Sequence, residues 1–116
     1  MKRACTLKEN YEFRRVYRQG KSAVGSTMVV YCRRNKLGRC RLGLTASTRI
    51  GGAVQRNRAR RRMREVYRLN RDKLSSGWDI ILVARGRTAS APWRELNEGF
   101  LRQCRKLGIL REEVEM

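Results

Sequence analysis

A run of arginines between residues 56 and 68 is the feature of this sequence with the clearest chemical use. Four of them recur at every fourth position, which on a helix forms one column along its surface: Arg56, Arg60, Arg64 and Arg68. Like charges at this spacing destabilise an isolated helix by up to about 0.5 kcal/mol per pair. A planar guanidinium group, however, matches phosphate oxygens with two parallel hydrogen bonds. The column therefore predicts a helix that binds the phosphates of a polyanion.

Other polar residues surround this column. Arg58, Arg61 and Arg62 are expected to cover much of the remaining helix surface. Asn57 adds an amide that both donates and accepts hydrogen bonds. A solvated surface helix usually alternates the signs of its charges, whereas Glu65 is the only acid in this run. Such a surface contacts phosphates and recognises shape rather than base edges. This mode of binding suits folded RNA better than sequence-specific recognition of DNA.

Aromatic residues in the first third of the chain form a second candidate site. Phe13 and Tyr17 lie four residues apart on an expected helix, and Tyr31 lies in an expected strand. Arg14 adds a positive charge beside them. Each ring alone is better explained by core packing, and this alternative stays open. Together the rings are able to line a groove in which unpaired bases stack, at about 1–3 kcal/mol per base.

The composition limits the classes of function. The chain has 116 residues, with 29 Lys and Arg against 10 Asp and Glu, so its formal net charge is +19, and 41% of its residues are hydrophobic. A folded protein with this charge is expected to function while bound to a polyanion such as RNA. Histidine is absent, which excludes a Ser-His or Cys-His triad and a Cys/His zinc site. We therefore expect no active site within the protein itself.

Cysteines and hydropathy indicate the environment of the protein. No Cys-x-x-Cys pair occurs among the four cysteines, which we expect to be free thiols: Cys5, Cys32, Cys40 and Cys104. A Cys32–Cys40 disulfide across a hairpin is the alternative. The sequence shows no signal peptide and no segment of the roughly 18 apolar residues that a membrane helix needs. We expect a cytoplasmic protein that contacts neither membrane nor DNA.

The apolar and turn residues predict one α+β domain over residues 1–116. Helices are expected at about 7–18, 53–73 and 91–107, and strands at 26–32, 41–47 and 78–84. A further strand is an option within residues 21–34.

Local signals refine this expectation. Thr6 and Ser90 are the expected N-caps of the first and last helices. The strands at 26–32 and 41–47 are expected to pair as a hairpin, because turn residues separate them. The middle helix allows the strands on either side of it to pair in parallel. Within that helix, a stripe of Ala59, Met63 and Val66, with Tyr67 at its edge, is expected to face the core.

Several segments closely resemble the family of bacterial ribonuclease P protein components. They are Arg41-Leu42-Gly43-Leu44-Thr45-Ala46-Ser47, then Arg49-Ile50-Gly51-Gly52-Ala53-Val54-Gln55-Arg56-Asn57-Arg58, and the pair Arg64-Glu65. The match also includes Glu12-Phe13 and Val16-Tyr17 near the start, and 79–85 near the end. The resemblance spans nearly the whole chain in the same order. Two departures, Thr48 and Gly52, precede the arginine helix, and Tyr17 stands where the family often has Phe.

The resemblance implies a fold and a function. The fold is an α-β-β-β-α-β-α two-layer sandwich with a left-handed βαβ crossover, a handedness opposite to the usual rule. The function is that of the protein subunit of ribonuclease P, which assists a catalytic RNA in removing the 5′ leader from precursor tRNA. The catalytic RNA, and not the protein, would hold the Mg²⁺.

The resemblance also assigns residues to these partners. Residues expected to contact the catalytic RNA are Arg49, Arg56, Asn57, Arg58, Arg60, Arg61, Arg64 and Arg68. Those expected to bind the single-stranded leader are Phe13, Arg14, Tyr17 and Tyr31. A structural protein that binds ribosomal RNA is the alternative, although the acid-rich C-terminus, 111–116, is unlike a basic ribosomal tail. A self-contained nuclease is disfavoured by the absence of histidine.

Overall fold

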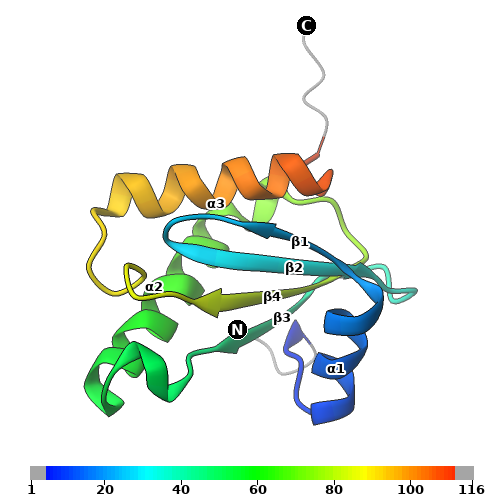
Figure 1. Cartoon of the computed structure of the whole chain (residues 1–116). Helices are drawn as coiled ribbons and strands as arrows, with labels where there is room; N and C mark the ends of the chain where they lie inside the picture. Colours follow the sequence, from blue (N-terminus) through cyan, green and yellow to red (C-terminus); the bar gives the residue numbers. More distant parts are fainter. Residues whose placement is uncertain (1–4, 112–116) are drawn as a thin grey trace, which may run out of the picture.

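A computed structural model of the chain describes residues 5–111, so most of the acid-rich C-terminus lies outside the described residues. The elements of the described part follow the order that the resemblance implies, α-β-β-β-α-β-α (Figure 1). Their bounds are α1 Asn10–Gln19, β1 Lys21–Val24, β2 Met28–Arg34, β3 Arg41–Thr45, α2 Ala53–Asn70, β4 Trp78–Ala84 and α3 Trp93–Leu107. Short 3-10 turns precede and follow α2, at Thr48–Ile50 and Arg71–Lys73.

The four strands form one sheet in the order β1-β2-β4-β3. β4 pairs antiparallel with β2 and parallel with β3, which confirms the parallel pairing across the middle helix. The expected hairpin between 26–32 and 41–47 is wrong, because β4 lies between these strands. Residues Ile80 to Leu82 of β4 are buried on both faces of the sheet, and such burial requires that β4 be a central strand. β2 instead forms its hairpin with β1, the optional strand of the sequence analysis.

The connection from β3 through α2 to β4 has the expected handedness. In Figure 1 both strands run toward the left, α2 returns behind them, and the chain moves up from β3 to β4. This is a left-handed crossover, which is rare among parallel βαβ units. It places α2 and α3 on the same face of the sheet.

That face carries the main core of the protein. The predicted stripe of α2 is confirmed, since Ala59, Met63, Val66 and Tyr67 are all buried in this core. α3 contributes Leu96, Phe100, Cys104 and Leu107, and the sheet contributes Met28, Val30, Leu42, Ile80 and Leu82. The two helices and the sheet thus make the two-layer sandwich.

α1 packs on the opposite face of the sheet, at one end of it. Val16 of α1 is fully buried in a smaller cluster with Leu7 and Ile81. The ring of Phe13 lies directly over Gly43 of β3, where a Cβ atom would stand 2.6 Å from a ring carbon. Glycine at this position therefore allows the helix to approach the sheet. The rest of this face is not covered by α1.

The expected N-caps of two helices are wrong. Thr6 forms an isolated parallel bridge with Leu42, and the N-cap of α1 is Glu9, which forms a capping box with Glu12. The N-cap of α3 is Pro92 rather than Ser90, so the helix begins at Trp93. At the other end of α3, Gly108 adopts the left-handed backbone conformation, with φ 75°, that commonly ends a helix.

The cysteines are free thiols, and the alternative Cys32–Cys40 disulfide is not formed. Cys32 and Cys104 are buried in the main core, and burial raises the pKa of Cys104 to about 12. The Cys40 thiol is half-buried and donates to the carbonyl oxygen of Ser75 at 3.1 Å. Among residues 5–111, no helix is long and apolar enough to cross a membrane.

Candidate nucleic-acid interface

One side of α2 presents a continuous row of guanidinium groups, which we call the arginine face. At about 100° per residue, this face collects Asn57, Arg60, Arg61, Arg64 and Arg68 on the flank beside the buried stripe. All of them are exposed except Arg60, which is half-buried. The first turn of α2 has no side-chain cap, so its amides add further hydrogen-bond donors at one end of this face.

The N-terminal end of the arginine face is tied to the end of β3. The Arg60 guanidinium donates to the side-chain oxygen of Asn57 at 3.3 Å and to the carbonyl oxygen of Ala46 at 3.4 Å. Arg56 is half-buried there, and its Nε is buried without a hydrogen-bond partner in the described part of the chain. A buried donor without a partner is costly unless a ligand satisfies it. This corner is therefore suited to an anion.

Two further arginines of the run are engaged within the protein. Arg62, expected on the surface, donates to the carbonyl oxygens of Thr88 at 2.8 Å and Ala91 at 2.6 Å. Burial lowers its pKa, and the neighbouring Arg58 lowers it further. Arg62 thus holds the loop before α3, and the expectation that it forms outer surface is wrong. Arg68 remains exposed but forms an ion pair with Glu65.

The remaining predicted contacts flank the arginine face. Arg58 is exposed and lies toward Arg62, on the other side of α2 from Arg60. Arg49 is exposed in the 3-10 turn Thr48–Ile50, just before the helix begins. The eight predicted residues therefore extend from the turn before α2 to its last turn without forming a single plane.

The part of the sheet that α1 leaves uncovered forms the second surface, which we call the open sheet face. Its floor consists of half-buried residues from three adjacent strands, Val29, Tyr31, Thr45 and Val83. Tyr17 borders it and is 39% exposed. The rings of Tyr17 and Tyr31 meet edge to face, with centroids 4.8 Å apart. Partial burial raises the pKa of Tyr17, so its phenol is neutral at physiological pH.

The structure separates the predicted aromatic residues into two roles. Tyr17 and Tyr31 lie together at the open sheet face, as expected. Phe13 is half-buried and packs against Leu7, Val16 and Ile81, so that much of its ring belongs to the core beneath α1. Val29, Thr45 and Val83 were not predicted to belong to this surface, although the two-residue alternation of the strands places them on the same face as Tyr31.

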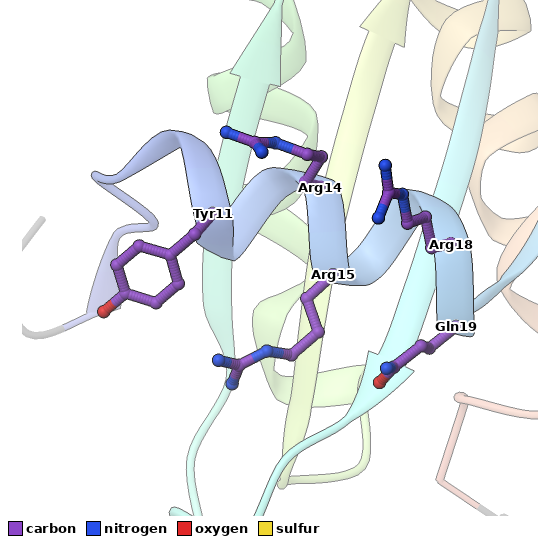
Figure 2. Close-up of a pocket in the computed structure, with 5 residues that line it drawn as sticks. All are labelled: Tyr11, Arg14, Arg15, Arg18 and Gln19. Carbon is purple, nitrogen blue, oxygen red and sulfur yellow. The ribbon is translucent and has the colours of Figure 1, made fainter.

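Arg14 projects from the outer surface of α1 rather than lying over the sheet. Figure 2 shows Arg14 and Arg18 on one side of the helix, pointing toward the C-terminal ends of β3 and β4. These strand ends carry Thr45 and Val83 of the open sheet face. Arg14 and Arg18 therefore border that face, and Arg18 is an addition to the predicted set.

The two surfaces meet at one corner of the molecule. Thr45 is the last residue of β3, and the next residue, Ala46, accepts the hydrogen bond from Arg60. Only a short segment with one 3-10 turn separates this point from the start of α2. The arginine face therefore begins where the open sheet face ends. One molecule is able to hold a single strand on the sheet and a folded polyanion on α2 at the same time.

An ion-pair network centred on Arg41, which was not predicted from the sequence, fixes the position of α1. The guanidinium of Arg41 binds both carboxylate oxygens of Asp79 on β4, at 2.9 and 2.8 Å, and Glu12 on α1 at 2.6 Å. Asn35 donates to the same Asp79 at 2.8 Å. Because all three charged groups are largely buried, the network ties the start of α1 to two strands.

The environments of both carboxylates favour their ionised forms. Burial acts to raise the pKa of Asp79, but hydrogen bonds from Arg41 and Asn35 outweigh it, so that the pKa lies below its usual value. The backbone amide of Glu9 is the main cause of the lowered pKa of Glu12, with the amide of Lys8 and Arg41 assisting. A lowered folded-state pKa contributes stability above the unfolded pKa, and this contribution is lost as the pH falls through the folded value.

We therefore expect the free energy of unfolding to fall as the pH drops below about 4, where unfolded Asp and Glu begin to protonate. Asp79→Asn should be less stable than the wild type at neutral pH and should lose less stability on acidification. Urea unfolding across the acid range measures this difference. Glu98→Gln, which removes an exposed ion pair with Arg94, should leave the pH profile unchanged and serves as the matched control. Parallel profiles for wild type and Asp79→Asn would contradict the assignment.

The fold and the two surfaces define a small, basic α+β protein of the nucleic-acid-binding class. Comparison with known sequences gives the family: a family model described as Ribonuclease P matches residues 1–108, and the chain belongs to this family. A ribonuclease P protein component from Natranaerobius thermophilus is 38% identical over 114 residues, covering 98% of this chain and 99% of the relative. One from Pelotomaculum thermopropionicum is 40% identical over 111 residues, covering 96% and 99%.

Solved structures of the same family share the fold. The ribonuclease P protein of Staphylococcus aureus matches with a TM-score of 0.82 and 27% identity, covering 94% of this chain and 100% of that one. The protein from Thermotoga maritima matches with a TM-score of 0.75 and 27% identity, covering 84% and 92%. The fold implied by the sequence resemblance is thus confirmed.

Proposed function

We propose that the chain is the RNA-binding subunit of a ribonuclease P ribonucleoprotein that removes the 5′ leader of precursor tRNA. In this proposal the arginine face, with Arg49, Arg56 and Arg58 beside it, contacts the catalytic RNA, and the open sheet face holds the single-stranded leader. The observation that supports it most strongly is the meeting of the two surfaces at Thr45 and Ala46. The leader would then leave the cleavage site directly onto the sheet.

The chemistry of cleavage is assigned to the RNA. The sequence contains no histidine, and in the described part of the chain five carboxylates are each paired with an arginine: Glu12, Glu65, Asp79, Glu95 and Glu98. The described residues contain no group of three His, Cys, Asp or Glu that is able to hold a metal ion. These five carboxylates are therefore engaged by guanidinium groups, which compete with any metal ion for their oxygens. We therefore place the Mg²⁺ that the reaction uses on the catalytic RNA.

The contribution of the protein is electrostatic and selective. Its net charge of +19 reduces the repulsion between catalytic RNA and substrate, two large polyanions. Stacking of leader bases on Tyr17 and Tyr31 is available to precursor tRNA and unavailable to the mature product, which has no leader. The protein therefore favours binding of substrate over product.

Reconstitution at low Mg²⁺ tests the proposed function. Labelled precursor tRNA is incubated with the catalytic RNA alone, with the protein alone, and with both. We expect leader removal only with both, because the protein supplies positive charge that Mg²⁺ otherwise provides. Cleavage by the protein alone would indicate a self-contained nuclease, and no stimulation of the RNA would favour the ribosomal alternative. Either result would contradict the proposal.

A further inference from the structure

The outer surface of α1 carries a basic and aromatic hollow that adjoins the open sheet face through Arg14 and Arg18 and continues beyond it. Its lining residues come from the exposed side of one helix: Tyr11, Arg14, Arg15, Arg18 and Gln19 (Figure 2). The hollow has a volume of about 250 Å³. Pockets for drug-sized ligands measure about 300–1,000 Å³, so this hollow would accommodate only part of a nucleotide, such as its base or a phosphate. Three of its five residues are cationic and none is anionic.

The arginines of this hollow share one property with Arg61 and Arg64 of the arginine face: within the described part of the chain, no carboxylate pairs with them. The adjoining hollow, of about 400 Å³, shares Tyr11 and Arg15 and contains the carboxylates of Glu12 and Asp79. Both of these are already bound by Arg41. A phosphate above α1 would therefore meet unopposed positive charge.

The aromatic residue of the hollow is placed to stack a base. Tyr11 is 57% exposed, and its ring packs with the guanidinium of Arg15, 5.6 Å from the ring centroid. Arg15 thus orders the ring while much of it stays open to solvent. An exposed tyrosine among arginines matches the pattern of single-strand binding sites, in which bases stack on rings and phosphates follow the cations.

The path along α1 connects this hollow to the open sheet face. On the helix Arg14 lies about 60° from Tyr17, which borders that face, and Tyr11 lies about 60° further round. Figure 2 shows Arg14 and Arg18 on the side toward the C-terminal ends of β3 and β4, and Tyr11, Arg15 and Gln19 on the opposite side. A strand leaving the sheet at Tyr17 would pass Arg14 and Arg18 before it reached Tyr11. α2 lies on the other face of the sheet.

From this continuity we propose that the outer surface of α1 is a second binding site for the leader, which takes a nucleotide distal to those on the open sheet face. Tyr11 stacks its base, and Arg15 and Arg18 contact its phosphates. The assignment rests on the proposed function, because it requires the leader to occupy the open sheet face first. It extends that function, because the affinity for precursor tRNA would then rise with leader length in two stages, first at the open sheet face and then at α1.

The test uses the reconstituted ribonucleoprotein and precursor tRNAs whose leaders lengthen one nucleotide at a time. With wild-type protein we expect affinity to rise as the leader fills the open sheet face and to rise again when it reaches α1. Tyr11→Ala and Arg15→Ala should abolish the second rise only, a loss of about fivefold or more for long leaders. Arg105→Ala, an exposed arginine on α3, removes the same charge and should preserve both rises.

Two results would overturn the second site. If both variants lose affinity equally for long-leader precursor, short-leader precursor and mature tRNA, Tyr11 and Arg15 contact an RNA segment other than the leader. If both variants keep wild-type affinity at every leader length, the hollow does not bind the leader and is an ordinary solvated surface. A wild-type protein that binds all precursors no better than mature tRNA would instead refute the proposed function itself. Because these side chains are exposed, unchanged melting temperatures should accompany the variants.

Discussion

Alanine at both Arg61 and Arg64 is expected to weaken binding of the protein to the catalytic RNA by about a hundredfold. Both side chains are exposed on the arginine face, and no hydrogen bond or ion pair with a carboxylate engages them within the described chain. Each would make a charge-assisted hydrogen bond to phosphate, worth about 1.5 kcal/mol at an exposed site. The expected loss is therefore a loss of contacts and not of folding.

The salt dependence of binding gives a second and sharper readout. Each phosphate contact releases counterions, so that log K falls with log salt by about 0.7–0.9 per contact. The double variant should show a slope reduced by about twice this amount. A matched variant with Arg102 and Arg105 replaced by alanine loses the same charge from exposed positions of α3. If the slope of log K against log salt is unchanged in the Arg61 and Arg64 double variant, α2 is not the RNA contact. The same conclusion follows if both double variants reduce the slope equally.

Tyr17→Ala is expected to weaken binding of precursor tRNA to the ribonucleoprotein by about tenfold and to leave binding of mature tRNA unchanged. The ring of Tyr17 borders the open sheet face and lies against Tyr31, so that its loss removes one stacking platform. Stacking of a base on an aromatic ring contributes about 1–3 kcal/mol. Only the precursor has a leader that benefits from it. The ratio of the two dissociation constants measures the effect.

Tyr17→Phe is the matched control for this prediction. It keeps the ring and removes only the hydroxyl group, which lies near Thr45 and Tyr31. Its precursor affinity should stay within about twofold of the wild type, because stacking does not need the hydroxyl group. Equal losses for precursor and mature tRNA in Tyr17→Ala would show that the ring supports the fold or the catalytic RNA rather than the leader.

The periodic features of the two surfaces were predictable from the sequence. The arginine column and the buried stripe of Ala59, Met63 and Val66 both follow from a helix of 3.6 residues per turn, and the structure places both on α2. Tyr17 and Tyr31 were expected together and are in contact. The handedness of the crossover, however, came only from the family resemblance, since the general rule points the other way.

Contacts between distant segments could not be predicted in this way. The hydrophobic alternation of β2 and β3 is satisfied by either neighbour, so it does not reveal that β4 lies between them. Arg62 looked like its exposed neighbours because its partners are backbone carbonyls 26 and 29 residues away. The network of Arg41 likewise joins side chains 29 and 38 residues apart. Only the folded structure shows that these two arginines hold α1 and the loop before α3.

The most direct test compares precursor and mature tRNA binding by the catalytic RNA with and without the wild-type protein. If the open sheet face holds the leader, the protein should raise affinity for precursor about tenfold more than affinity for mature tRNA. The difference should vanish when the leader is trimmed away. An equal gain for both RNAs would mean that the protein supplies only positive charge, and it would contradict the central claim that this chain recognises the leader.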